Sequence, residues 1–339
     1  MRVPSDRPTL IDVAARAGVS TATASRALSG RSRVASTTAA AVKLAAQQLG
    51  YVDSSPRAGR VAVLTGGYTS QLVEAVSSVT QGDEDAPGTV VVTSGRDLTH
   101  EIAQLSSLLT DPGISAVIIA GGRWDREPEN TLLREMIGDY RTAGKPLVFC
   151  GRPALAPGCP ELVVDYDNHG GGRAAAAFLA GQGHRQVLLL RGPLGFTTSD
   201  QRVAGFLEGC HEFGVEVATQ IGHRGRDSGV AGLEAALAAG TRFTAVFGES
   251  DQLAVGAMAV LAQIGRRVPE DVSVMGFDDM RFTEDLRVPL TTVRVPFVDV
   301  GRTALALALD QDQVDRATHV VAGTHIVVRQ STAPLSTLR

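Results

Sequence analysis

The arrangement of apolar and polar positions divides the chain at about residue 60. Before that point, short apolar groups recur at the spacing of a helix, and each run stops near a glycine. Leu10, Val13 and Ala14 form the first run behind Thr9, a residue type that caps helices, and Gly18 follows its end. This pattern predicts three short helices, over residues 10–17, 21–28 and 37–49.

Beyond residue 60, continuous apolar runs alternate with longer segments of helical spacing. Such runs are typical of strands buried on both faces, and their alternation with helices is typical of parallel α/β sheets. We expect strands over residues 61–64, 89–93, 116–120, 146–150, 162–164, 186–190, 245–247 and 272–276. We expect helices over residues 72–80, 100–109, 132–143, 171–182, 202–213, 229–239 and 251–264. About eight such strand–helix units are more than a single sheet usually contains. We therefore predict two doubly wound parallel-sheet lobes with a ligand cleft between them.

The first two predicted helices are joined by a very short turn that contains Gly18. Two helices joined in this way make a helix-turn-helix, whose second helix enters the major groove of DNA. That second helix carries short polar groups suited to phosphate contacts, and one long cation, Arg26, suited to a bidentate contact with guanine. The alternative that the same spacing allows is a small structural helix bundle.

Charge is distributed unevenly between the two parts of the chain. Residues 1–60 hold nine Arg or Lys against three Asp, which gives +6. The whole chain carries −4, so the remainder carries −10. A basic head on an acidic body favours nucleic-acid binding at one end only.

Composition and motifs narrow the class of protein further. With 339 residues, 44% of them hydrophobic, the chain is long enough for a small head and a two-lobed body. No long apolar run opens the chain, so we expect no signal peptide, no membrane span and a cytoplasmic location. Three cysteines without C-x-x-C spacing argue against a disulfide framework or a zinc site. The common hydrolase, phosphate-loop and metalloprotease motifs are missing, so we expect no catalytic residue, no metal and no cofactor.

A series of short motifs runs along nearly the whole chain. It comprises DVAARAGVSTATASRAL at 12–28, VDYDNHGGGR at 164–173, GHR at 183–185, RVAGF at 202–206, SDQ at 250–252, GAM at 256–258, PEDVSVMGFDD at 269–279 and PLTTV at 289–293. Each motif is weak alone, but the full series in this order behind such a head is highly specific. The series resembles the LacI/GalR family of bacterial transcription regulators.

This resemblance implies a fold, an assembly and a mode of regulation. It implies an all-α helix-turn-helix head over residues 1–51, a hinge over 52–60, and a body like a periplasmic binding protein. The first lobe would comprise 61–164 plus about 295–323, and the second 165–294 plus about 324–334. It further implies a homodimer on a near-palindromic operator, with a small effector, such as a sugar, bound between the lobes. The tail lacks leucine heptads, which favours a dimer over a tetramer.

The resemblance also assigns roles to individual residues. The positions that would read bases at the start of the second helix are Thr21, Ala22 and Arg26. The other positions expected to contact DNA, most of them through phosphates, are Thr9, Ser20, Thr23, Ser25, Ser29 and Arg33. Alanine at position 22 leaves a contact with a thymine methyl group as its available chemistry.

In the cleft, the resemblance implies that Arg202 and Asp278 hold effector hydroxyls from opposite sides. A charged donor fork facing a charged acceptor suits a polyol. The further pocket positions that it implies are Tyr68, Gly151, Arg152, Phe196, Asp227, Ser250 and Val295. The alternative for Arg202 and Asp278 is a buried ion pair that joins two segments.

Two stretches depart from the family pattern. The hinge normally carries an Asn and Ala-Arg-x-Leu, whose Leu wedges into the minor groove, but here residues 53–60 are several residues short and lack that Leu. The loop at 65–70 lacks the usual Asn-Pro-aromatic stretch, and Tyr68 is the residue that could replace its stacking function. A DNA-binding family member that no effector controls is therefore the alternative function. An enzyme would need an acid/base pair in the cleft, where Asp278 is the one candidate carboxylate, and we do not expect one.

Overall fold

The computed structural model describes residues 8–29, 34–49, 51, 59–66, 70–80, 87–95, 98–127, 129–156, 159, 161–310, 313–314 and 316–335. Most of the expected hinge, Arg33 and Tyr68 lie outside these residues. The backbone of the second helix is described, but the side chains of Ser25, Arg26 and Ser29 are not.

The head is a three-helix unit with its own small core, and its predicted helices are confirmed. It consists of α1 (Leu10–Ala17), α2 (Thr21–Ser29) and α3 (Ser36–Leu49). Thr9 and Asp12 form a capping box at the start of α1, in which the Thr9 backbone N–H donates to Asp12 Oδ2 at 2.7 Å. Gly18 ends α1 in the left-handed conformation, with φ of 68°. Val13, Ala24 and Val42, one from each helix, are fully buried together.

The first lobe is built on a six-stranded sheet with the order β11-β5-β4-β3-β1-β2. Its strands are β1 (Arg60–Thr65), β2 (Thr89–Thr93), β3 (Ile114–Ala120), β4 (Leu147–Cys150), β5 (Leu162–Tyr166) and β11 (Thr318–Ala322), and every pairing between them is parallel. Its helices are α4 (Ser70–Thr80), α5 (Leu98–Thr110), α6 (Glu129–Thr142) and α11 (Phe297–Leu309). β5 continues to Tyr166, two residues past the expected end of this lobe at 164.

The second lobe repeats this plan with the strand order β12-β10-β9-β8-β6-β7. Its strands are β6 (Gln186–Arg191), β7 (Glu216–Ile221), β8 (Ala245–Gly248), β9 (Ser273–Asp278), β10 (Thr291–Arg294) and β12 (His325–Val327), of which β12 alone among the described strands pairs antiparallel. Its helices are α7 (Asn168–Gly181), α8 (Thr197–Glu212), α9 (Arg226–Ala238), α10 (Asp251–Gln263) and the short 3₁₀ helix η1 (Arg281–Thr283).

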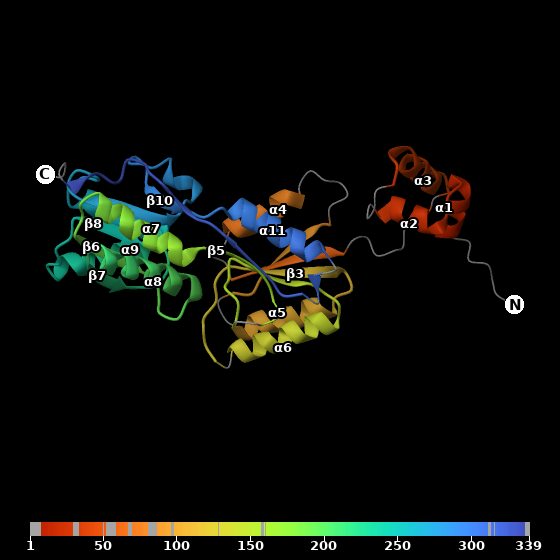
Figure 1. Ribbon diagram of the computed structural model, residues 1–339, viewed down its shortest axis with the longest axis horizontal. Helices are drawn as coiled ribbons and strands as arrows, with labels where there is room; N and C mark the ends of the chain where they lie inside the picture. The colour runs from red at the N-terminus through yellow and green to blue at the C-terminus, as the bar shows by residue number, and fades with distance from the viewer. Residues whose placement is uncertain are drawn as a thin grey trace.

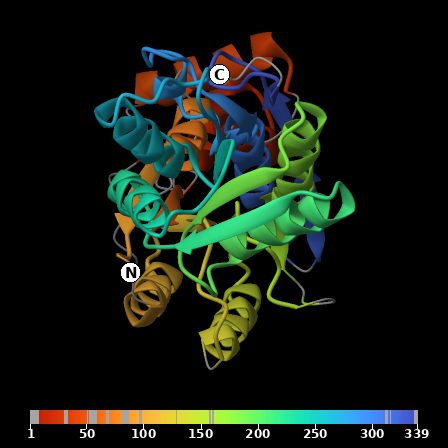
Figure 2. The same ribbon diagram turned by 90° about the vertical axis from the view of Figure 1, so that its left-hand side faces the viewer.

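Helices cover both faces of each sheet, as strands with continuous apolar runs require. In β6, Val187 and Leu189 face the cluster that contains α7 and α8, whereas Leu188 and Leu190 face the cluster that contains α9 and α10. In the first lobe, α5 and α6 lie on one face of the sheet and α4 and α11 on the other (Figure 1). Figure 2 looks onto the second lobe and shows helices on either side of its strands. The predicted two-lobed α/β body is therefore confirmed.

The chain passes between the two described sheets three times: after β5, after β10 and after β11. Several elements that the sequence did not predict lie at sheet edges or beside these crossings. They are the strands β7, β10, β11 and β12 and the helix α11. β7 and β11 are exposed along much of their length and include polar residues, so no apolar run extends over the whole strand as it does in a central strand.

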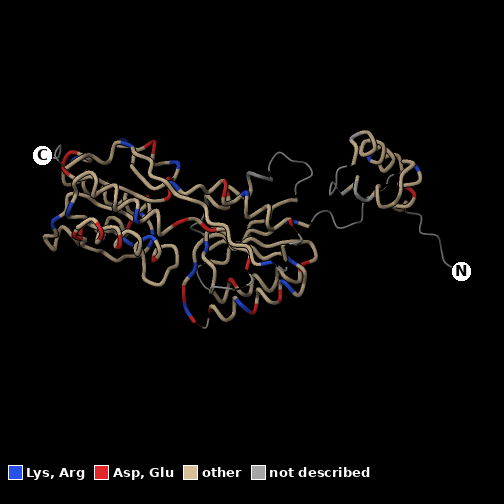
Figure 3. Tube along the Cα trace, viewed as in Figure 1, with Lys and Arg blue, Asp and Glu red and all other residues tan. Residues whose placement is uncertain are grey.

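Charged residues of both signs are interspersed along the two lobes (Figure 3). In the part of the chain that the structure describes, no helix is long and apolar enough to cross a membrane.

Candidate DNA-binding helix and effector cleft

The exposed beginning of α2 holds the residues expected to read DNA. Thr21 and Ala22 are exposed there, while Ala24 and Ala27 of the same helix are buried in the core of the head. The Ser20 hydroxyl caps the helix by accepting the Thr23 backbone N–H at 3.1 Å. The exposed Thr21 and Ala22 are therefore not part of the buried core that packs α2 against the other two helices.

The other residues expected to contact DNA lie near the ends of helices, or their side chains are not among those that the structure describes. Thr9 is exposed at the start of α1, where its hydroxyl contacts Asp12 Oδ2 at 2.6 Å. The Ser20 and Thr23 hydroxyl groups lie 2.9 Å apart. Ser25, Arg26 and Ser29 are placed on α2 by the backbone alone.

A cavity of about 330 Å³ lies where strands of both sheets end. On the first-lobe side, its lining residues include those that follow β1, β2, β3 and β4, namely Gly66, Gly95, Gly121 and Arg152. On the second-lobe side, they follow β6 and β7 and include Pro193, Phe196, His223 and Arg224. The carboxyl ends of parallel strands form the usual ligand edge of such sheets, so the cavity occupies the place predicted for the cleft.

The first-lobe side of the cavity contains a buried ion pair between Arg152 and Glu101 of α5. Arg152 Nη1 and Nη2 lie 2.7 and 3.2 Å from the two Glu101 carboxylate oxygens, a bidentate arrangement. Arg152 Nε also donates to the Gly121 carbonyl at 2.8 Å. Gly151, with φ of 66°, makes the left-handed turn that brings Arg152 to the cavity.

Arg202 and Asp278 approach each other in the second lobe, with 2.8 Å between Nη2 and Oδ1. Further donors of Arg202 go to Asn168 Oδ1 at 2.8 Å, the Glu249 carbonyl at 2.9 Å and the Tyr166 hydroxyl at 3.3 Å. Burial raises the pKa of Asp278, and the Arg202 guanidinium offsets part of that rise. This geometry corresponds to the buried ion pair that the sequence left open as an alternative.

The Arg202–Asp278 pair lines a recess of about 40 Å³ together with Ser250, and Arg224 lines both this recess and the main cavity. The Ser250 hydroxyl caps α10 by accepting the Leu253 backbone N–H, so it acts as a helix cap in this structure. The backbone at Asp278 has φ of 114°. The loop that follows is held by the Met280 N–H, which donates to buried Asp251 Oδ2 at 2.7 Å.

Three expected pocket residues line neither the cavity nor the recess: Gly151, which only precedes Arg152 in the chain, Asp227 and Val295. Asp227 lies in the first turn of α9 with a fully exposed side chain and lines neither the cavity nor the recess. Val295 is buried beside the second chain crossing and lines a separate groove with Glu74 and Arg281. The family resemblance implies both of these last two positions, but the backbone of α9 and of the second chain crossing determines where the two side chains lie.

The structure also places residues at the cavity that the sequence did not single out: Glu101, Arg123, Trp124 and Arg224. Trp124 and Phe196 come from different lobes and contact each other edge-to-face, with ring centroids 5.6 Å apart. A usable signal was the position of Arg123 and Trp124 just after the predicted strand 116–120, at the ligand edge of the sheet. Among the described residues, no group of three or more His, Cys, Asp or Glu could hold a metal ion.

Comparisons with known proteins agree with this architecture. The family model for bacterial regulatory proteins of the lacI family matches residues 9–54, and the model for a periplasmic binding protein-like domain matches residues 176–332. The HTH-type transcriptional regulator CelR of Thermobifida fusca is 33% identical over 336 residues, covering 96% of this chain and 98% of that protein. The HTH-type transcriptional regulator reg1 of Streptomyces lividans is 30% identical over 340 residues, covering 96% of each.

Two similar solved structures cover nearly the whole chain. A transcriptional regulator CelR–cellobiose complex is 31% identical, with a TM-score of 0.69, and covers 96% of this chain and 100% of that one. A lac repressor dimer bound to operator and the anti-inducer ONPF is 25% identical, with a TM-score of 0.73, and covers 98% of this chain and 100% of that one. The chain therefore belongs to the LacI family of DNA-binding transcription regulators and is not an enzyme.

Proposed function

We propose that this regulator is a homodimeric repressor and that a sugar bound between its lobes controls its affinity for operator DNA. The observation that carries the proposal is the cavity itself, which lies at the carboxyl ends of strands from both sheets and is lined by the aromatic side chains of Trp124 and Phe196. Aromatic rings suit the apolar face of a pyranose, and a cleft at this edge of two parallel sheets is a usual ligand site. The CelR–cellobiose complex shows that a similar protein binds a sugar.

The DNA side of the proposal rests on the exposed start of α2. Thr21, Ala22 and Arg26 would contact base edges, and the hydroxyl groups of Thr9, Ser20 and Thr23 would contact phosphates. Two heads related by a two-fold axis require a near-palindromic operator. For the effector to act, it must bind the two lobe arrangements unequally, by roughly 1–3 kcal/mol of coupling.

The test is fluorescence-anisotropy binding of the full chain to the intergenic DNA beside its own gene, at fixed salt, with and without cellobiose, glucose and other sugars. We expect specific binding that one sugar weakens. Arg26→Ala should cost about 1–3 kcal/mol and relax sequence preference, because a bidentate base contact is lost.

Lys43→Ala is the matched control, because it removes one exposed positive charge from α3 without touching the base-reading end of α2. It should change binding to all sequences alike. Equal loss of specificity in both variants would contradict the assignment of Arg26. A protein whose melting temperature and operator affinity no sugar changes would contradict the effector proposal.

A second function, DNA binding without effector control, is favoured by one observation. Arg202 and Asp278 engage each other, and Arg202 makes three further hydrogen bonds within the protein. Because these Arg202 donors already have acceptors in the protein, a ligand would gain little by hydrogen-bonding to them. The same titration distinguishes the two functions, because specific DNA binding that is indifferent to every sugar supports this second one.

A further inference from the structure

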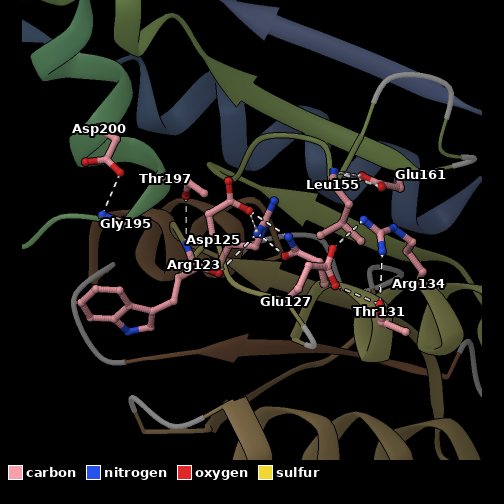
Figure 4. Close-up of polar contacts among 12 residues, drawn as sticks. Arg123, Asp125, Glu127, Thr131, Arg134, Leu155, Glu161, Gly195, Thr197 and Asp200 are labelled. Carbon is pink, nitrogen blue, oxygen red and sulfur yellow. Dashed lines mark hydrogen bonds and ion pairs between the residues drawn. The ribbon is translucent and has the colours of Figure 1, made fainter.

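A short segment of the first lobe reaches across the cavity and bonds to the second lobe. This segment, here named the strap, consists of residues 121–127 between β3 and α6. The Asp125 N–H donates to the Gly195 carbonyl at 2.8 Å, and the Thr197 N–H donates to the Arg123 carbonyl at 2.9 Å. Trp124 and Phe196 thus form an antiparallel β-bridge between the lobes. Figure 4 shows Arg123, Asp125, Gly195 and Thr197 at this junction.

The strap approaches the second lobe so closely that a methyl group at Gly122 would force its neighbours or the strap to shift. A Cβ atom built on Gly122 would lie 2.6 Å from the Phe196 ring and 2.8 Å from the Thr198 hydroxyl. The Thr197 hydroxyl adds a further bond between the lobes by accepting the Arg123 N–H at 3.1 Å. Because these bonds join different lobes, they can form only when the lobes have this relative orientation.

On its own lobe, the strap is fastened to the start of α6. Arg123 Nη1 donates to Asn130 Oδ1 at 2.6 Å and to Asp125 Oδ1 at 2.9 Å, and Asn130 Nδ2 donates to the same Asp125 oxygen at 2.9 Å. The hydrogen bond from Asn130 and then that from Arg123 lower the pKa of Asp125, which keeps its carboxylate charged. The strap is therefore fixed at one end and bonded to the opposite lobe at the other.

Trp124 is the side chain that this arrangement delivers to the cavity. Its ring is half-buried, lines the cavity and meets Phe196 at an interplanar angle of 85°. The Arg126 guanidinium lies 4.6 Å from its ring centroid. The face of an aromatic ring carries partial negative charge, so it attracts the C–H groups on the apolar face of a sugar ring as well as cations.

We propose that Trp124 is an effector-contact residue, a platform for the apolar face of a pyranose ring, and that the strap is a clasp that links the lobes around the bound sugar. This inference rests on the proposed sugar response. The ligand class that it specifies is a neutral pyranose sugar with a continuous apolar C–H face, for which cellobiose and glucose are the probes.

The protein carries its own reporter, because Trp124 is the single tryptophan in the chain. Cellobiose or glucose is titrated into the full chain, and tryptophan emission and calorimetric binding are followed together. We expect emission to shift in step with calorimetric saturation. Trp124→Leu should weaken binding of that sugar about tenfold, and Trp124→Phe should weaken it less, because an aromatic face remains.

The clasp is tested separately from the platform. Gly122→Ala forces the strap away from Phe196 and Thr198 while keeping Trp124, so sugar affinity should fall about tenfold and the emission of the free protein should move toward that of exposed tryptophan. Gly138→Ala is the matched control, because a Cβ there, on α6, meets nothing within 4 Å. It should leave both readings unchanged. Circular dichroism and melting curves establish that each variant is folded.

The outcomes separate this inference from the proposed function. If cellobiose or glucose binds the unsubstituted protein but emission stays constant and Trp124→Leu binds within twofold, the platform is overturned and the sugar response stands. If Gly122→Ala binds like Gly138→Ala, the clasp is overturned. If neither sugar binds the unsubstituted protein, the pyranose assignment and the inference built on it both fail, whereas specific DNA binding is unaffected.

Discussion

Arg202 Nη2 and Asp278 Oδ1 lie 2.8 Å apart, and both side chains are largely buried beside the cavity, at 8% and 18% exposure. Arg202 comes from α8 and Asp278 from the end of β9, so their contact joins two elements that are distant in sequence. The Arg202 guanidinium also packs over the Phe277 ring, at 4.1 Å from its centroid. The pair therefore contributes to the packing of the second lobe, whatever it also does for a ligand.

Removing one charge of this pair should destabilise the protein strongly. Asp278→Asn leaves the buried Arg202 charge without its ionic partner, and we expect the free energy of unfolding to fall by about 3 kcal/mol. Denaturant unfolding followed by circular dichroism measures the change. Asp227→Asn is the matched control, since its exposed carboxylate should contribute within about 0.5 kcal/mol. Equal stability of the two variants would mean that the ion pair does not hold the lobe together.

Asp165 should make stability depend on pH. Burial raises its pKa to about 6, above its ordinary value of 3.8. Between these two values the folded chain holds a proton that the unfolded chain has lost, so this residue lowers stability as pH rises from about 4 to 6. Asp165→Asn, which keeps an oxygen for the Tyr166 N–H, should be more stable than the unsubstituted protein at pH 8 by about 3 kcal/mol, and equally stable below pH 4. Melting temperatures across this range check both limits, and a constant difference between the two proteins would contradict the assignment.

The contact between α7 and α8 should be intolerant of a single methyl group. A Cβ on Gly172 would lie 2.1 Å from the Arg202 carbonyl oxygen and 2.9 Å from the Phe206 nitrogen. Gly172→Ala should therefore cost about 1–3 kcal/mol through overpacking. Gly181→Ala, at the end of the same helix, meets nothing within 4 Å and should be neutral or stabilising by up to about 1 kcal/mol. Denaturant unfolding measures both variants: the midpoint should fall for Gly172→Ala and should stay the same or rise for Gly181→Ala, each relative to the unsubstituted protein.

The capping box of the head should stabilise α1 measurably. Thr9→Ala removes the hydroxyl that caps the Asp12 N–H, and we expect α1 to lose about 1 kcal/mol of local stability. Hydrogen exchange of α1 amides in the full chain measures this, and they should exchange roughly fivefold faster. Thr9→Ser keeps the hydroxyl and should exchange like the unsubstituted protein. Unchanged exchange in Thr9→Ala would mean that packing against α2 and α3, without the cap, holds α1.

Some elements could be read from the sequence because their signals are local. The helices of the head can be predicted from the spacing of apolar residues, and the ends of α1 from the capping residue Thr9 and from Gly18. The central strands show themselves because burial on both faces demands a continuous apolar run, as in β3 and β6. The edge strands β7 and β11 could not be read in this way, because solvent on one side permits the polar residues that hide them.

The location of the cavity could be predicted from the sequence, but only some of the residues that line it could. Parallel strands put their carboxyl ends at one edge, so the location follows from the order of strands and helices. Arg152 and Phe196 were anticipated by resemblance and do line the cavity, whereas Asp227 and Val295 were anticipated by the same reasoning and do not. A position in a motif does not specify the direction of a side chain, which depends on the turn that carries it.

The sequence by itself determined the three-helix head, the two-lobed α/β body and membership of a DNA-binding family, because caps, apolar periodicity and motif order are properties of short stretches. The tertiary structure decided that Arg202 engages Asp278, that Arg152 engages Glu101, and that Trp124 meets Phe196 across the two lobes. These contacts join residues that are distant in the chain. Their formation depends on how the sheets stack, twist and face each other, and no local pattern encodes that.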